Sequence, residues 1–365
     1  MSKHRLLAFH LPQFHPVPDN DAWWGKGFTE WRNVTRAEPQ FPGHYQPHLP
    51  ADLGFYDLRL PEARQAQADL ARAYGIHGFV YYHYWFNGRR ILERPVNEIL
   101  RLGEPDFPFC LCWANENWSR RWDGNERELL LGQDYSPEDD LEHIAWLITA
   151  FRDPRYIKVH GKPLLLVYKL SHLPDPAGTV LRWRRAVEAA GFPGLYLSNV
   201  EADIPEHGLM PRHGLDAAVE FAPDWKALPR QRVNPWLDWM PRRIMRLRSG
   251  VYARHRVFEY AELVERMLAK PAPGYLRYPG VTPSWDNCAR RKENAIILRN
   301  ASPSAYGAWL KETLARFNPP NPEENFVFIN AWNEWAEGNH LEPCLKWGRS
   351  YLEETKQALA SAHPA

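Results

Sequence analysis

Two glutamates three positions apart, Glu334 and Glu337, are the residues of this sequence best suited to catalysis. They follow an apolar, β-branched segment that begins at Phe326, a pattern typical of a strand buried on both faces. Because an extended strand would point them to opposite faces, we expect the chain to curl after Asn333 so that the two carboxylates meet. Paired carboxylates, one protonated and one ionised, are the working groups of glycosidases. The alternative is a solvated acidic turn, which the neighbouring Trp332 and Trp335 disfavour.

The rest of the sequence predicts the elements that would position this pair. Eight apolar segments are predicted strands: 6–14, 78–86, 107–113, 162–169, 195–201, 217–221, 280–284 and the one that begins at 326. Helices are predicted after most of them, including one that Ser136 caps and Pro137 begins. This alternation predicts an α/β fold, a (β/α)8 TIM barrel, whose active site lies at the carboxyl ends of the strands. An open doubly wound sheet is the alternative, but no Gly-rich turn follows the first strand.

Polar and aromatic residues that could hold a substrate cluster in two kinds of place. The Pro- and Trp-rich segment 15–60 is expected to be a long loop that covers the barrel mouth. It supplies His15, Trp23, Trp24, Glu30, Trp31, Tyr45 and His48. The ends of the predicted strands supply His83, Trp85, Trp113, Asn115, Glu116, Trp118, Tyr168, Asn199, Glu220, Trp285, Asn333 and Trp335. Glu116 is the one serious rival to Glu334 and Glu337 as a catalytic carboxylate. For His83, a place in the core explains the residue as well as a substrate contact does.

The run Asn333-Glu334-Trp335-Ala336-Glu337-Gly338 resembles the signature of glycoside hydrolase family 99 and of its bacterial WbsX-type relatives, which are encoded with polysaccharide and O-antigen genes. Other segments resemble the WbsX-type pattern, from Leu11-Pro12-Gln13-Phe14-His15 through Tyr82-His83-Tyr84-Trp85-Phe86 to Trp113-Ala114-Asn115-Glu116-Asn117-Trp118. The resemblance extends from residue 5 to about 343. Ala336 replaces a His of family 99 proper, which bears on substrate identity more than on reaction class.

This resemblance implies retaining cleavage, in family 99 at an α-mannosidic linkage, of an oligosaccharide or polysaccharide. Glu334 would act as base on the sugar 2-hydroxyl, and Glu337 as acid and then base at the glycosidic oxygen. A route in which one Glu attacks the anomeric carbon is equally compatible with the spacing. Neither route needs a metal or another cofactor, and no ligand cluster with metal spacing is visible in the sequence.

Two other functions stay open. WbsX-type proteins are often labelled glycosyltransferases, and Asp19-Asn20-Asp21 has the DxD form that many sugar-nucleotide transferases use to hold a metal. A carbohydrate-binding protein without catalysis would keep the aromatic residues but would not need both Glu334 and Glu337.

Composition agrees with a single catalytic domain over residues 1–365. A formal net charge of +1 gives no reason to expect a nucleic-acid partner, and 17 Trp suit sugar stacking. The four cysteines have neither disulfide nor zinc spacing, which favours a reducing compartment. The apolar run after Arg5 is too short for a signal peptide, and none reaches membrane-spanning length, so we expect a cytoplasmic protein.

The segment 224–256 departs from the barrel pattern because it is rich in Arg with interleaved Trp and Met. We favour an inserted surface helix that packs its apolar face on the barrel. The alternative is weak peripheral contact of residues 230–256 with an anionic membrane, or binding of an acidic or pyrophosphate-linked glycan.

Overall fold

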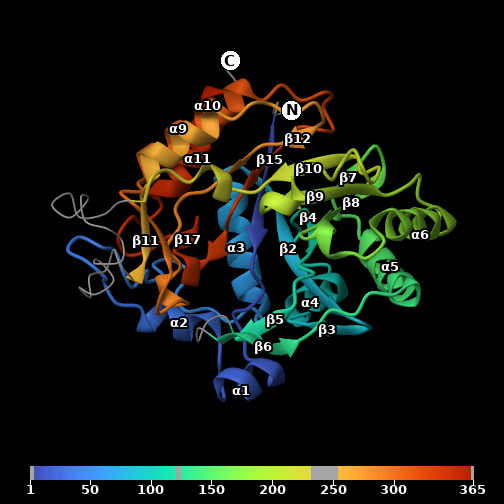
Figure 1. Ribbon diagram of the computed structural model, residues 1–365, viewed down its shortest axis with the longest axis horizontal. Helices are drawn as coiled ribbons and strands as arrows, with labels where there is room; N and C mark the ends of the chain where they lie inside the picture. The colour runs from blue at the N-terminus through green and yellow to red at the C-terminus, as the bar shows by residue number, and fades with distance from the viewer. Residues whose placement is uncertain (1–3, 121–124, 232–253, 363–365) are drawn as a thin grey trace.

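Nine parallel strands with helices between them form a nearly closed barrel (Figure 1). The structure is a computed structural model that describes residues 4–120, 125–231 and 254–362. The strands, in chain order, are β1 (Arg5–His10), β2 (Ile76–Phe86), β4 (Phe109–Trp113), β8 (Lys162–Val167), β9 (Tyr196–Glu201), β10 (Ala217–Glu220), β12 (Arg277–Tyr278), β13 (Gly280–Val281) and β15 (Phe326–Ile329). Their order in the sheet is β12-β10-β9-β8-β4-β2-β1-β15-β13. The predicted TIM-barrel class is confirmed.

The two shortest strands share one position in the barrel. β12 pairs with β10, with Ala218 opposite Arg277, whereas β13 pairs with β15, with Gly280 opposite Phe328. Pro279 separates them, and its carbonyl accepts a hydrogen bond from Phe328 N at 2.9 Å. A Cβ on Gly280 would lie 2.0 Å from the Glu220 carbonyl oxygen, so only glycine fits there. The predicted seventh strand, 280–284, therefore began and ended too late: pairing starts at Arg277, before Pro279, and ends at Val281, before Pro283.

The predicted helices around the barrel are present. Within the described ranges, the helices are α1 (Pro18–Trp24), α2 (Glu30–Arg36), α3 (Pro61–Ala73), α4 (Arg94–Leu102), α5 (Pro137–Phe151), α6 (Pro176–Ala189), α9 (Tyr260–Leu268), α10 (Pro303–Arg316) and α11 (Ser350–Ser361). The Ser136 hydroxyl accepts a hydrogen bond from Asp139 N at 3.1 Å, which confirms the predicted cap of α5. α1 and α2 correct the expectation that 15–60 is loop throughout. Figure 1 places them with β5 (Trp118–Arg120) and β6 (Asn125–Leu131) at the end of the barrel away from the termini.

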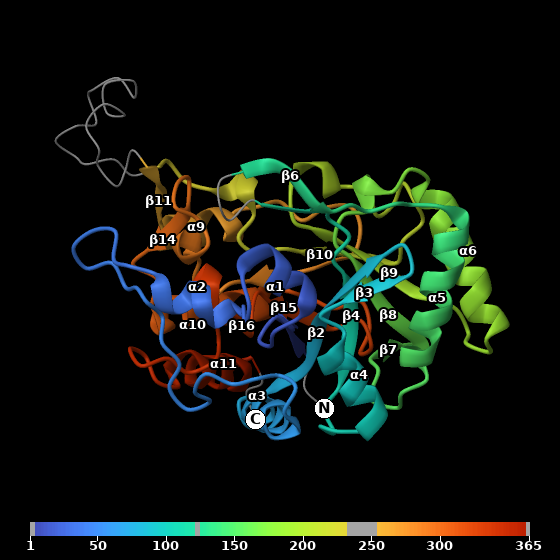
Figure 2. The same ribbon diagram turned by 90° about the horizontal axis from the view of Figure 1, so that it is seen from below.

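A smaller unit stands beside the barrel. β11 (Arg256–Glu259) and β14 (Ile296–Arg299) form a separate parallel pair that the sequence did not predict (Figure 2). Most of the basic segment 224–256, with its expected surface helix and membrane contact, lies outside the described residues. In the described part of the chain, no helix has the length and apolar character needed to cross a membrane.

Candidate active site

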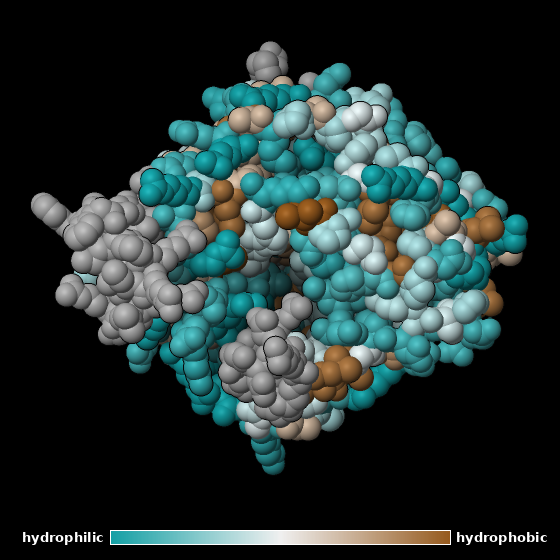
Figure 3. Space-filling model, viewed as in Figure 1, coloured by the Kyte–Doolittle hydropathy of each residue, from teal (hydrophilic) through white to brown (hydrophobic). Residues whose placement is uncertain are grey.

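A cavity of about 710 Å³ opens among the carboxyl ends of the strands, and Glu334 and Glu337 lie in its wall. The space-filling view shows the hollow near the centre of one face (Figure 3). Its aromatic lining consists of Trp24, Tyr82, Tyr84, Trp118, Tyr168, Phe221, Trp225 and Trp285. A concave site with aromatic walls and a few polar groups is the usual form of a small-ligand site, and flat aromatic rings suit the faces of sugar rings.

The chain curls at the predicted place. β15 is followed by the two-residue strand β16 (Asn333–Glu334) and by the 3₁₀ turn η6 (Trp335–Glu337), which ends at Gly338 with φ +56°. Asn333 ties this turn to the end of β1, because its side chain accepts from Leu11 N at 2.7 Å and donates to Leu11 O at 3.0 Å. The turn brings both carboxylates to the same side of the chain.

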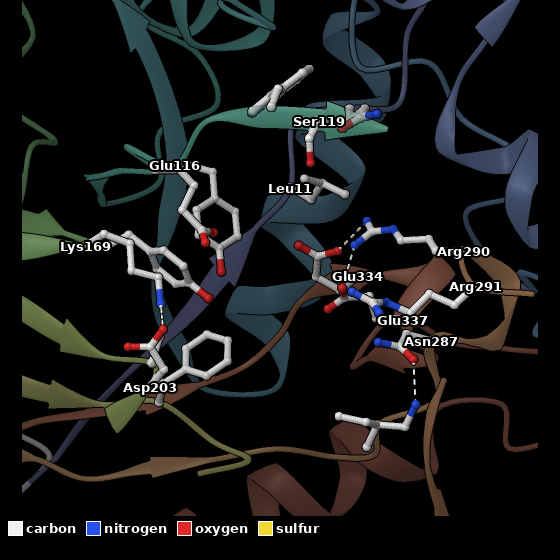
Figure 4. Close-up of a pocket in the computed structure, with 18 of the residues that line it drawn as sticks. Leu11, Glu116, Ser119, Lys169, Asp203, Asn287, Arg290, Arg291, Glu334 and Glu337 are labelled. Carbon is white, nitrogen blue, oxygen red and sulfur yellow. Dashed lines mark hydrogen bonds and ion pairs between the residues drawn. The ribbon is translucent and has the colours of Figure 1, made fainter. Parts of the chain in front are cut away.

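Arg290 connects the two glutamates (Figure 4). Its terminal nitrogens lie 2.8 Å from Glu334 Oε2 and 2.7 Å from Glu337 Oε1. A third carboxylate, Glu30 at the start of α2, lies 3.3 Å from the same guanidinium and has no exposed surface. One arginine therefore neutralises part of the charge of three acids. Buried carboxylates cost free energy unless a cation pairs with them.

The protonation of this group is shifted. Burial raises the pKa of Glu334 to about 8, since the neighbouring Glu337 and Glu30 add to the effect and Arg290 only partly opposes it. Burial likewise raises the pKa of Glu30. These shifts favour a carboxyl cluster that keeps a proton near neutral pH, and a protonated carboxyl beside an ionised one is the arrangement that can act as general acid and base.

The 3₁₀ turn η5 (Asn287–Ala289) positions Arg290. Asp286, just before η5, donates its backbone N–H to Glu337 O at 2.6 Å, so the turns that carry Arg290 and Glu337 are joined. The Asp286 carboxylate accepts from His44 Nε2 at 2.6 Å and from Gln46 at 2.8 Å. This arrangement fixes both the arginine and the second glutamate.

His44, Asp286 and Cys288 are close enough to be considered as metal ligands. The Nδ1 atom of His44 accepts a hydrogen bond from Gln40 N at 2.9 Å, so the ring proton must be on Nε2, the atom that faces Asp286. A metal at Nε2 would displace that proton and leave Nδ1 facing a donor. The three residues therefore fit a closed hydrogen-bond network better than a metal site.

The opposite wall carries a second polar group (Figure 4). The Lys169 ammonium lies 2.5 Å from Asp203 Oδ2, and both residues line the cavity with Glu116. Asn115 holds Lys169 in place, because its amide accepts from Lys169 N and donates to Lys169 O, each at 2.8 Å. Asn115 itself is fully buried. It positions Lys169 in the cavity wall but does not line the cavity.

Side chains alternate along β2, and the pair that lines the cavity is Tyr82 and Tyr84. His83 and Trp85, which we predicted as substrate contacts, point the other way toward α5. His83 lies 3.0 Å from His143, and Trp85 donates to Asp139 at 2.8 Å. The interpretation of His83 as a core residue therefore holds in this structure.

Among the predicted substrate contacts, Trp24, Glu116, Trp118, Tyr168 and Trp285 line the cavity. The others do not. Buried residues away from its wall are His15, Glu30, Trp31, Trp113, Asn115, Asn199, Asn333 and Trp335. Their packing accounts for several: Trp335 stacks on His340 with ring centres 3.8 Å apart, and Asn199 donates to Glu206 O.

The remaining predicted contacts lie around the cavity. Trp23 packs edge-on against Trp118, and Glu220 pairs with Lys270 at 2.6 Å. Tyr45 and His48 line a second, smaller cavity. Sequence reasoning missed Arg290, Lys169, Asp203, Tyr82 and Tyr84. Strand alternation could have suggested the tyrosines, but nothing in the basic run at Arg290 points to the glutamates.

Comparison with known proteins identifies the family. The family model described as "Glycosyltransferase WbsX" matches residues 6–355. The chain belongs to the WbsX family. Two curated relatives, each an "Uncharacterized protein WxcX" from a strain of Xanthomonas campestris pv. campestris, are 47% identical over 366 residues. The match covers 98% of this chain but only 50% of each relative, so the chain spans about half the length of these curated proteins.

Solved structures share the fold of this WbsX-family chain. A GH99 endo-alpha-mannosidase from Bacteroides thetaiotaomicron, in complex with BIS-TRIS-propane, has a TM-score of 0.59 at 13% identity, covering 99% of this chain and 98% of that one. A "glycoside hydrolase-like protein" has a TM-score of 0.58 at 14% identity, covering 98% and 94%. At such low identity the similarity establishes the barrel fold, and the resemblance to family 99 and WbsX-type proteins is confirmed at that level.

Proposed function

We propose that this chain is a retaining glycoside hydrolase that cleaves a glycosidic bond, α-mannosidic or related, in a bacterial oligosaccharide or polysaccharide. One observation carries the proposal: Glu334 and Glu337 converge on Arg290 in the wall of an aromatic cavity of about 710 Å³. Retaining enzymes need two carboxyl groups close together, about 5–5.5 Å apart, whereas inverting enzymes leave room for a water. The shared guanidinium supports the close arrangement.

The roles of the two glutamates follow from chemistry at the glycosidic oxygen. The family resemblance assigns the base on the 2-hydroxyl to Glu334 and the acid to Glu337. Because burial raises the pKa of Glu334, its role as base requires that its proton pass to solvent before the carboxylate takes the proton of the 2-hydroxyl. If Glu334 instead donates the proton, no such transfer is needed, and the two roles are exchanged.

An aryl glycoside with a good leaving group separates these assignments. Departure of such a group needs no proton, so a variant that lacks the acid still releases the aryl group in the first step but no longer cleaves the natural substrate. The assignment to Glu337 predicts this pattern for Glu337→Gln and complete inactivity for Glu334→Gln. The reverse pattern would exchange the two roles without removing the proposal.

A glycosyltransferase is the second candidate, because the family model carries that description. The DxD residues give it little support. Asp21 Oδ1 accepts from Gly27 N at 2.8 Å, Asp19 pairs with Arg89, and Asn20 has no exposed surface. None of the three lines the cavity with the glutamates.

The test is to incubate the protein with defined mannose- and rhamnose-containing glycans and to analyse the products with and without sugar nucleotides. Shortened glycans without a nucleotide support the hydrolase, and extension that depends on a nucleotide supports the transferase. Binding without either product would indicate a carbohydrate-binding protein. Glu334→Gln is the control, because its loss of activity ties any hydrolysis to this site.

A further inference from the structure

A second cavity of about 290 Å³ lies beside the first, and Trp285 lines both. We call it the second pocket and define it by Phe41, Tyr45, His48, Lys346 and Trp347. Its wall also includes Gly338 and His340, which follow the turn that carries Glu337. Its size is near the lower limit of small-ligand sites, and it has no role in the chemistry described above.

The hydrogen bonds of two histidines determine which ring nitrogen carries a proton. The Glu342 carbonyl can only accept, so His340 donates to it from Nδ1 at 2.8 Å and keeps a lone pair on Nε2. That lone pair accepts from His48 Nδ1 at 2.9 Å. Burial lowers the pKa of His48 to about 4 and that of His340 well below its usual value, so both rings are neutral.

It follows that His48 Nε2 is a hydrogen-bond acceptor. Besides His340, the His48 ring has a hydrogen bond to the backbone of Tyr45, and the Nδ1–H shares it because a carbonyl can only accept. Since His48 lines the second pocket, this acceptor is available to a ligand that brings an O–H or N–H donor.

A donor stands in the same pocket. The Lys346 ammonium lies 4.7 Å from the ring centre of Tyr45 and 4.5 Å from that of Trp347. Within the described ranges, no carboxylate lies in ion-pair distance of Lys346. The other charged groups are engaged, because Asp286 accepts from His44 and Gln46, and Arg299 pairs with Glu259.

We propose that the second pocket binds one sugar residue of a polysaccharide, outside the catalytic cavity. A sugar hydroxyl donates to His48 Nε2, another accepts from Lys346, and the rings of Tyr45 and Trp347 offer apolar faces. A purely apolar ligand would leave the His48 acceptor unpaired, at a cost. The choice of a saccharide rests on the proposed function, whereas the pairing of acceptor and donor does not.

Saturation-transfer NMR of the full chain with D-mannose, L-rhamnose, D-glucose and D-galactose tests this proposal. We expect at least one sugar to bind. Lys346→Met should weaken that binding about five-fold, the net value of roughly one hydrogen bond. His48→Phe, which removes the acceptor and fills space, should abolish it. Lys311→Met, an exposed change on α10, is the matched control and should leave it unchanged.

Failure would be clear. If none of the four sugars receives saturation, or if transfer persists unchanged in both pocket variants, the second pocket does not bind a sugar. Lys346 is exposed, so we expect the Lys346→Met variant to fold. If His48→Phe unfolds the protein, Lys346→Met alone decides the outcome. Glycan hydrolysis measured separately distinguishes the two proposals: hydrolysis without pocket binding refutes only the pocket, and the converse refutes only the hydrolase.

Discussion

Arg290 places one terminal nitrogen 2.8 Å from Glu334 and the other 2.7 Å from Glu337, so a single planar group sets the relative position of both carboxylates. Neither glutamate is adjacent to Arg290 in the sequence, and the hydrogen bond from Asp286 N to Glu337 O joins the two turns. The separation and the protonation of the pair therefore depend on residues far from the motif itself.

The first prediction concerns the glutamates. Glu334→Gln and Glu337→Gln should each lower kcat on the natural substrate by at least about 10²–10⁴-fold, the usual contribution of a positioned acid or base. At about pH 5, where the raised pKa of Glu334 costs little stability, the melting temperature should stay near that of the wild type, because each change removes one of three acids around one arginine. Kinetics and thermal melting measure both. Full activity in either variant would contradict the proposed hydrolase.

Removal of the arginine should act on both stability and activity. Arg290→Met leaves Glu30, Glu334 and Glu337 without their cation, and loss of one partner from a buried pair typically costs about 3–5 kcal/mol. The loss should be smaller at low pH, where the acids take up protons. Urea denaturation at low and high pH measures this loss. The matched control is Arg182→Met, which removes a partner of Asp140 on another helix. This control should leave the pH profile of turnover unchanged. Equal losses at low and high pH would contradict the charge argument.

The raised pKa of Glu334 predicts how stability depends on pH. Glutamate titrates near about 4.3 in an unfolded chain, and Glu334 titrates at about 8 in the folded protein. Between these values the folded protein holds more protons, so the free energy of unfolding falls as pH rises. Glu334→Gln should reduce the difference between about pH 5 and about pH 8. Glu342, whose pKa burial raises to about 7, acts in the same direction, so the comparison is between variants. If the free energy of unfolding depends on pH equally in the wild type and in Glu334→Gln, this prediction is contradicted.

Alternation along β2 predicts opposite effects of neighbouring changes. Tyr84→Phe removes a hydroxyl from the cavity wall and should lower kcat/KM about ten-fold without loss of stability. Trp85→Phe removes the donor to Asp139 and should cost about 1–3 kcal/mol of stability without loss of activity per folded molecule. Steady-state kinetics and urea denaturation separate the two. Exchanged effects would place His83 and Trp85, rather than the tyrosines, in the site.

The proposed hydrolase should work without a metal or a nucleotide. We expect turnover to survive excess chelator, and Asp19→Asn with Asp21→Asn to leave most of it intact, apart from a local effect of losing the Asp21–Gly27 hydrogen bond. Calorimetry should detect no binding of common sugar nucleotides. Micromolar binding that chelator abolishes would instead favour the transferase.

The sequence by itself determined the barrel and the catalytic candidates. Alternating apolar strands and helices, the cap at Ser136 and the turn that must follow Asn333 are local features, which depend on periodicity and on residues a few positions apart. The carboxylate motif is local too, so the sequence alone singles out Glu334 and Glu337 as candidates.

Only the tertiary structure decided what surrounds them. Which face of β2 lines the cavity depends on its register with β1 and β4, and a shift by one residue exchanges Tyr84 for Trp85. Tyr45 and His48 lie in a pocket of their own because the first loop folds against residues near the C-terminus. Arg290 reaches Glu334 across 44 positions of sequence. Such contacts follow from packing between distant segments, which the spacing of residues in one chain does not specify.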